Sequence, residues 1–370
     1  MSETTAQNIR ICQWGESEFL NAAADWQELQ SDSNADPLFS GWLWQSSWWT
    51  HFAERNQLRL FIVVAEDQDG RLLGIAPLFK RVTVIRKIVR IRRIELIGNI
   101  FRGAETMHSE YLGFIVRRRY ERDVATALYN YALNSKHCDE LILSDMRTDS
   151  VTFTVAQDTA KRDSLFLRSP GHDEGFAILL QDGFSSYLRQ LSGNARRKMF
   201  NQRARLENSG NVSFETVGQG ELEAFFSILN DLHQRRWGKK AFEGESLDFV
   251  HDMAQKLQFE GQFASTILYQ NGKPISALFD LVCGGRRYNI QMGFDPMVQP
   301  NLSLGLLHLG YAIEDSYRLG YESYQLLVGS GKTTEYKARL CQERIGVGTM
   351  RIILPRWLQS AHRIFSIFTH

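Results

Sequence analysis

The chain contains one order of strands and helix twice, and this repeat restricts the folds that it can adopt. Each copy reads as a strand, a tight turn, a second strand, a third strand with a Gly-Phe pair, a helix and a fourth strand. The strand segments of the two copies are 59–79, 110–116 and 139–146, then 263–282, 287–294 and 323–329. The first strand pair turns at Asp69-Gly70 and the second at Asn271-Gly272, which are strong signals for hairpins.

The repeat predicts an α/β protein with a mixed sheet and two domains of similar design. With 370 residues the chain is long enough for two hydrophobic cores. We expect an N-terminal domain over residues 8–165 and a C-terminal domain over 176–355, with a cleft between them, because the intervening segment is polar and lacks clear periodicity. A helix that begins just beyond a strand leaves backbone N–H groups free beside the sheet edge, which suits a phosphate-bearing ligand.

Composition and charge exclude several classes of protein. The formal net charge is +1, so no global charge draws the chain to nucleic acid or to membranes. The polar start lacks the apolar core of a signal peptide, and no apolar run approaches the roughly 20 residues of a membrane span. The four cysteines and nine histidines show no metal-ligand spacing, so we expect a cytoplasmic protein with free thiols and no metal.

A basic segment, residues 80–98, follows the first hairpin. Its β-branched residues predict a strand, and it carries Arg86, Lys87, Arg90 and further arginines. One interpretation is a sheet edge protected by charge. The other is a surface that meets an anionic polymer, a lipid headgroup or a donor phosphate, and the sequence leaves both open.

The second copy holds the best candidate for a ligand site. Its third strand ends near Phe294, and Asn301 or Ser303 can begin the next helix. The N–H groups at the start of that helix carry a partial positive charge and can bind a pyrophosphate. We therefore expect donor binding by Asn301, Ser303, Leu304 and Gly305, although strand, helix and strand in this order also occur without a ligand.

Several segments in the same order resemble GNAT-type acyltransferases. The resemblance covers about residues 8–355 and is strongest to the tandem-domain type associated with cellulose and exopolysaccharide synthesis; the chain also resembles Fem-type aminoacyl transferases. The matching segments are PLF (77–79), LSGNARRKMFNQRARLE (191–207), LHQRRWGKK (232–240), GFDP (293–296) and the glycine-to-YK segment with Gly329, Gly331, Tyr336 and Lys337. The resemblance implies two GNAT-like domains, the first shaping the acceptor site and the second binding the donor.

In GNAT enzymes a Q/R-x-x-G-x-G/A loop binds the pyrophosphate of acyl-CoA. Here Gln299 can begin that loop, but Leu302 and Leu304 occupy the positions of the small residues and Gly305 comes one place late. Fem-type enzymes lack this signature and use aminoacyl-tRNA. The resemblance thus implies acetyl-CoA or another acyl-CoA as co-substrate, with aminoacyl-tRNA as the alternative.

Acyl transfer needs a base, an oxyanion donor and a proton source for the leaving group. We predict His233 and Asp280 as candidate bases, Lys337 or backbone N–H groups as oxyanion donors, and Tyr288 as the proton source. Each has a structural alternative: His233 as a helix-end histidine, Tyr288 as a packing residue and Lys337 as a solvated one. An unpaired carboxylate at Asp280, in the apolar strand FDLVC, would be costly.

Two groups of residues are predicted to bind substrate. Arg196, Arg197 and Lys198 are expected to face phosphates, and Arg236 with Trp237 could hold a sugar or nucleotide by charge and stacking. Packing is the alternative for the second pair.

The resemblance therefore implies acyl transfer from acyl-CoA to an amine or hydroxyl, and we expect the acceptor to be a sugar or polysaccharide precursor. The alternatives are a Fem-type transferase and a non-catalytic module of a polysaccharide-synthesis assembly. Of these functions, only the Fem-type transferase would bind a nucleic acid, namely tRNA. Contact with a membrane surface or with a synthase complex is a further expectation.

Overall fold

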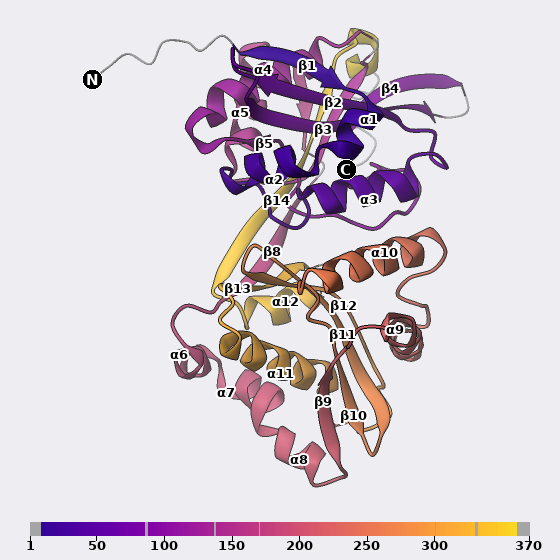
Figure 1. Ribbon diagram of the computed structural model, residues 1–370, viewed down its shortest axis with the longest axis vertical. Coiled ribbons are helices and arrows are strands. Elements are labelled where there is room, and N and C mark those ends of the chain that lie inside the picture. Colours follow the sequence, from indigo (N-terminus) through magenta and orange to yellow (C-terminus); the bar gives the residue numbers. More distant parts are fainter. Residues whose placement is uncertain are drawn as a thin grey trace. The chain divides into compact units, whose positions relative to one another are not determined.

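The computed structural model describes residues 9–85, 88–136, 138–169, 171–299, 301–329 and 332–360, and it divides into two compact units (Figure 1). Unit 1 contains the chain up to His172 together with the residues from Gly346 onward, and unit 2 contains Asp173–Ile345. Residues 346–355 thus belong to unit 1, whereas the sequence analysis assigned them to the C-terminal domain. Gly331, which the resemblance included, lies outside the described residues. No helix of the described residues has both the length and the apolar character to cross a membrane.

Unit 1 is built on a mixed sheet whose strands follow the order β1-β2-β3-β4-β6-β14, with β5 paired to β3 and β7 paired to β14. Its elements are β1 (Arg10–Trp14), α1 (Glu16–Asn21), α2 (Ala23–Ser31), α3 (Trp42–Phe52), β2 (Arg59–Glu66), β3 (Leu72–Ile85), β4 (Val89–Leu96), β5 (Ile115–Val116), the 3-10 turn η1 (Arg118–Tyr120), α4 (Glu121–Leu133), β6 (Glu140–Arg147), α5 (Val151–Arg162), β7 (Phe166–Arg168) and the C-terminal strand β14 (Glu343–Ile353). The neighbouring strands of this order are antiparallel, except for the parallel pair β4 and β6.

Unit 2 repeats this design in the order β8-β13-β12-β11-β10-β9. Its elements are β8 (His172–Leu179), α6 (Phe184–Gln190), α7 (Gly193–Arg196), the π-helical turn η2 (Arg197–Asn201), α8 (Arg203–Glu207), β9 (Val212–Thr216), α9 (Leu222–Trp237), α10 (Glu245–Phe259), β10 (Thr266–Gln270), β11 (Lys273–Cys283), β12 (Arg286–Phe294), α11 (Leu304–Arg318), β13 (Ser323–Val328) and α12 (Lys332–Ala338). Again one pair, β12 and β13, is parallel, and the others are antiparallel.

The repeat explains most of these strands, but one assignment is wrong. The third strand of the first copy is β4, which lies in the basic segment, and residues 110–116 contribute only the short β5. β3 continues beyond Phe79 to Ile85 and returns directly as β4, so β4 takes the central position beside β6. The second hairpin turns as expected, with φ of 50° at Asn271 and 71° at Gly272, the left-handed values that such a two-residue turn requires.

Helices cover both faces of the central strands of unit 2. A Cβ at Gly293 of β12 would lie 2.8 Å from Leu229 O and from His233 N, so α9 crosses this strand at its glycine. A Cβ at Gly305 of α11 would contact the ring of Phe294 and the sulfur of Met292. Because neighbouring residues of a strand point to opposite faces, α9 and α11 lie on opposite faces of β12.

Candidate functional site

The two parallel strands of unit 2 separate shortly after they begin. β12 and β13 pair only from Arg286–Tyr288 with Ser323–Gln325 in the described part of the chain. Beyond this point β13 has an irregularity between Gln325 and Leu327 in its pairing with β8, and Leu327 has a left-handed φ of 60°. Such a conformation is rare outside glycine, and an irregularity of this kind locally bends a strand. We call the divergence of β12 and β13 beyond Tyr288 and Gln325 the notch.

Helix α11 connects the two sides of the notch, and its first turn carries free main-chain donors. Ser303 precedes the helix, and its side chain makes no capping hydrogen bond. The N–H groups of the first helical residues have no acceptor within the helix. Leu302 and Leu304 are buried against Leu206 of α8, Leu268 of β10 and Ile275 of β11. These leucines therefore pack on the α8 side of the helix and on the strands away from β13.

A cluster of aromatic and basic side chains joins the start of α11 to the end of α9. Phe294, at the end of β12, lies against Gly305 and makes an edge contact with Trp237, with ring centroids 5.7 Å apart. The Arg236 guanidinium lies 5.2 Å from the centre of the Phe294 ring and 5.7 Å from that of Trp237. Trp237 remains 46% exposed, so this surface is available to a ligand. The structure thus brings the predicted residues Gly305, Arg236 and Trp237 together through Phe294, which the sequence analysis did not select.

His233 lies beside this cluster, one turn before Trp237. The two rings are 4.5 Å apart, and His233 Nδ1 lies 2.7 Å from the carbonyl oxygen of Lys239. A carbonyl can only accept, so Nδ1 carries the hydrogen and Nε2 of the neutral ring carries the lone pair. This tautomer is the one that a base acting through Nε2 requires.

Asp280 has a different environment from the one that a base needs. It has no exposed surface and accepts hydrogen bonds from Arg287 Nε at 2.8 Å, Asn289 Nδ2 at 2.7 Å and the Tyr324 hydroxyl at 2.6 Å. Burial raises the pKa of the Asp280 carboxyl, and the Arg287 guanidinium opposes that shift. These contacts argue against Asp280 as a general base, because it has no surface for an acceptor to reach; they indicate instead that it holds β11, β12 and β13 together.

The contacts of Tyr288 and Lys337 also support the fold of unit 2. Tyr288 is fully buried at the last parallel pair of β12 and β13. Lys337 of α12 donates to the carbonyl oxygens of Leu327 at 3.3 Å and Val328 at 2.7 Å, and so it secures the end of β13. The predicted roles of Tyr288 as proton source and Lys337 as oxyanion donor stay predictions.

His308 is a buried polar residue that the sequence analysis missed. Its Nδ1 lies 2.8 Å from the Ser276 hydroxyl and its Nε2 lies 3.1 Å from the Thr266 hydroxyl, so it ties α11 to β10 and β11. Burial, helped by the positive charge of Arg287, lowers the pKa of His308 to about 3. A histidine within the apolar run LGLLHLG was the available signal for a buried, neutral side chain.

The predicted phosphate-facing residues are placed along the middle of α11 rather than at its start. Met199 of η2 packs so closely that its carbonyl oxygen would lie 2.3 Å from a Cβ at Gly310. Arg196 donates to Leu191 O and Arg197 to Asn194 Oδ1, within their own helical segment. Lys198 belongs to the same turn and is half-buried.

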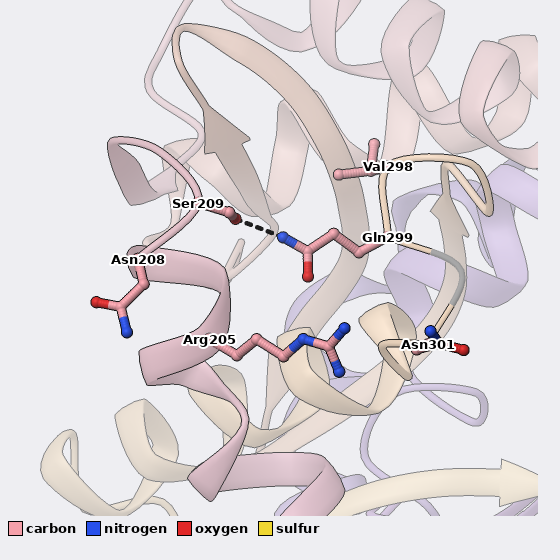
Figure 2. A pocket seen from close by; sticks show the side chains of 6 residues that line it. All are labelled: Arg205, Asn208, Ser209, Val298, Gln299 and Asn301. Atoms are coloured by element: carbon pink, nitrogen blue, oxygen red, sulfur yellow. Dashed lines mark hydrogen bonds between the residues drawn. The ribbon is translucent and has the colours of Figure 1, made fainter.

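A different basic residue, Arg205 of α8, lies near the beginning of α11. It lines a polar pocket of about 340 Å³ together with residues from the end of α8 and from the loop before α11, namely Asn208, Ser209, Val298, Gln299 and Asn301 (Figure 2). Figure 2 shows Gln299 reaching across this pocket to the Ser209 hydroxyl, to which it donates a hydrogen bond. Asn301 and Gln299 are thus beside the helix start, as the sequence analysis expected for Asn301.

In unit 1 the corresponding place, where β4 and β6 separate, is filled by a segment of the chain itself. β4 and β6 also pair over three residues, Arg93–Glu95 with Glu140–Ile142. Beyond them, Leu112 forms a parallel bridge to Met146, and its N–H donates to Asp145 O. Asn99 donates to Asp145 Oδ2 at 2.6 Å and to Ser109 O at 2.7 Å. We call residues 97–112 the insert of unit 1.

Comparisons with known proteins agree with this geometry. Residues 193–338 match the family model described as the acetyltransferase (GNAT) domain. The fold is similar to the solved structure of FemX (TM-score 0.61, 11% identity, covering 95% of this chain and 99% of that one). It is also similar to the C-terminal domain of a putative lysylphosphatidylglycerol synthetase from Agrobacterium fabrum (0.55, 10%, 95% and 97%) and to L-PGS from Bacillus licheniformis (0.53, 11%, 93% and 95%).

None of the curated proteins matches the chain significantly in sequence. The predicted mixed α/β class with GNAT-like architecture is nevertheless confirmed by the family match and by the topology of the sheets. Residues 193–338 of this chain are thus similar to a GNAT acetyltransferase domain, within a fold that is similar to that of FemX.

Proposed function

We propose that the protein is an acyltransferase whose unit 2 binds an activated, anionic acyl donor at the notch and transfers the acyl group to an amine or hydroxyl. The observation that carries this proposal is the early separation of β12 and β13 beside the uncapped start of α11. A separated strand leaves main-chain groups free, and a helix start attracts anions. An acyl-CoA carries both an extended amide-containing arm and a pyrophosphate, so it matches both features.

The donor contacts in this proposal are mainly from the backbone. The N–H groups of Leu304 and Gly305, with Ser303 and Asn301 before them, would hold the pyrophosphate. Arg205 adds a positive charge beside the same loop. This assignment accommodates Leu302 and Leu304 at the positions of the family's small residues, because their side chains pack toward α8 and the outer strands.

The acceptor would bind over the surface formed by Phe294, Arg236 and Trp237. Aromatic faces beside a guanidinium suit a sugar ring with polar or anionic substituents. His233 Nε2 would take the proton from the attacking nitrogen or oxygen as the new bond to the acyl carbon forms. The C–S bond of the thioester would then break, and the proton held by His233 would pass to the departing sulfur of CoA. Placing acceptor and thioester together can itself supply several kcal/mol, about 7–11 at best.

Ligand-induced stabilisation tests the donor assignment. Acetyl-CoA at about 100 times its dissociation constant should stabilise the folded protein by about 2.7 kcal/mol, seen as a higher unfolding temperature. Pantothenate and adenosine diphosphate serve as controls, because each offers only part of the donor. If acetyl-CoA and a longer acyl-CoA both fail to stabilise the protein, the proposal is contradicted.

A second measurement tests the chemistry separately from binding. Free CoA thiol released from acetyl-CoA would be followed in the presence of amino sugars such as glucosamine. His233→Gln should lower the rate by about 100-fold or more while leaving stabilisation by acetyl-CoA unchanged. An unchanged rate would remove His233 from the reaction.

The alternative donor is an aminoacyl group carried by tRNA. The similarity in fold to FemX and to lysylphosphatidylglycerol synthetases supports keeping this candidate, as does the absence of the small residues at 302 and 304. It predicts tRNA binding that weakens steeply with salt, through the basic residues of 189–205. Stabilisation by tRNA and by no CoA species would favour it. A non-catalytic role would be favoured if His233→Gln left the modification of polymer in cells unchanged.

A further inference from the structure

The hairpin of β3 and β4 extends beyond the rest of the sheet of unit 1. β2 accompanies β3 only as far as Lys80, which pairs with Arg59, and β6 begins opposite Arg93. Between these points the two strands pair with each other from Val82–Arg92 to Ile85–Val89. The described residues of 82–91 therefore form a two-stranded ribbon, which we call the ribbon (Figure 1).

One face of the ribbon is covered and the other is not. Ile91 is fully buried against Ile353, Leu358 and Phe166. Val82 and Val84, whose cross-strand partners are Arg92 and Arg90, point the other way and are 58% and 52% exposed. The exposed apolar surface continues at the tip, where Ile88 is 83% exposed. Contiguous exposed β-branched residues at a strand end are unfavourable in water unless something covers them.

The charge around this apolar surface has one sign. From Lys80 to Arg93 the sequence has seven basic residues and no acidic one. Three of these arginines are already held by acids outside the ribbon, Arg81 by Glu95, Arg92 by Asp139 and Arg93 by Glu140. Arg90 is exposed beside Val84, and Arg86 and Lys87 lie between the two strands in the sequence.

We propose that the ribbon binds to the surface of an anionic lipid bilayer, with Val82, Val84 and Ile88 entering the interface and the basic residues contacting the headgroups. Apolar side chains framed by cations match the boundary between acyl chains and anionic headgroups. A stable protein interface buries about 800 Å² on each partner, and a few side chains on a narrow ribbon offer a small part of that area. The proposal does not depend on the acyl-transfer reaction.

Vesicle co-sedimentation with the full-length protein tests this inference. Vesicles of phosphatidylcholine with a third of phosphatidylglycerol should retain the protein at low salt, and vesicles of phosphatidylcholine alone should retain much less. Val84→Ser/Ile88→Ser and, separately, Arg90→Glu should each weaken binding to anionic vesicles by about 10-fold or more. Both changes lie at exposed positions, and unchanged unfolding temperatures would show that the fold is retained.

The matched control is Phe259→Ser, which removes an apolar side chain that is 88% exposed at the end of α10 in unit 2. It should bind vesicles like the original protein. Equal loss in this control would overturn the proposal, as would vesicle binding that the ribbon variants leave unchanged. A dimer in light scattering that Val84→Ser/Ile88→Ser converts to a monomer, without vesicle binding, would assign the ribbon to a second copy instead.

Discussion

The two units solve the same structural problem in opposite ways. In each, a pair of parallel strands separates after three residue pairs, and β6 and β13 each carry a residue with a left-handed φ just beyond, Asp145 at 53° and Leu327 at 60°. Unit 1 fills the separation with its own insert, through Leu112 and Asn99. No isolated bridge to β13 is found in unit 2 over the described ranges. A repeated fold can thus use the same separation once for packing and once, as we propose, for a ligand.

The largest effects should come from the buried ion pairs that fix the parallel strands in both units. Asp280→Ala should lower the free energy of unfolding by about 3–5 kcal/mol, because it leaves the buried Arg287 guanidinium without its main partner. Glu140→Ala should do the same in unit 1, where Glu140 binds both Arg93 and Arg351. Denaturation in urea measures both.

Asp158→Ala is the control, because its ion pair with Arg122 is exposed and should contribute about 0.5 kcal/mol or less. A loss below about 1 kcal/mol for Asp280→Ala would show that the pair does not hold the notch in place.

An effect of intermediate size should appear in the pH dependence of stability, through His308 of unit 2. The pKa of His308 is about 3 in the folded protein and about 6.5 in the unfolded chain, so between these values the unfolded state binds the extra proton. Stability from this group is therefore complete above about pH 6.5 and falls as the pH drops, by about 2 kcal/mol between pH 7 and pH 5. His308→Gln should lose correspondingly less between those pH values, whatever its stability at pH 7. Equal pH dependence in the two proteins would show that His308 is not buried as a neutral ring.

The smallest effect should appear in ligand binding. Gly305→Val places a Cβ about 2.9 Å from a ring carbon of Phe294, so the start of α11 must shift. Stabilisation by acetyl-CoA should then require about 10-fold more ligand or disappear. Gly310→Ala, in the same helix but against Met199 O, should lower stability and leave the affinity of the folded protein unchanged. If both variants bind acetyl-CoA normally, the donor lies elsewhere and the two units are more alike than we propose.

Sequence alone was sufficient where the signal is local. The Asn271-Gly272 turn follows from residues that tolerate left-handed φ, and the start of α11 follows from the strand, loop and helix pattern. The sequence also shows Asp280 as a carboxylate in an apolar strand, and its role as a base stays a prediction. Its partners Arg287, Asn289 and Tyr324 come from two other strands, and no spacing rule indicates such pairs.

The features that the sequence does not predict depend on contacts between residues that are far apart in the chain. Segments 80–98 and 110–116 both carry β-branched residues, and only the sheet register shows that β4 is the strand next to β6. Phe294 and Arg205 were missed because their importance depends on contacts with Gly305 and with the loop before α11. The insert of unit 1 depends on hydrogen bonds between residues about 46 positions apart, such as Asn99 and Asp145, which local pattern cannot reveal.

Unit 1 is made of two separate parts of the chain, the residues up to His172 and those from Gly346 onward, so its parts are synthesised at different times. The residues of β14 from Gly346 onward, which pair with β6 and β7, leave the ribosome after every residue of unit 2 has been made. Unit 2 can complete its strands while the N-terminal sheet still lacks one. The unit that is translated first therefore receives its last strand at the end of synthesis, and a premature stop after Ile345 would remove most of that strand.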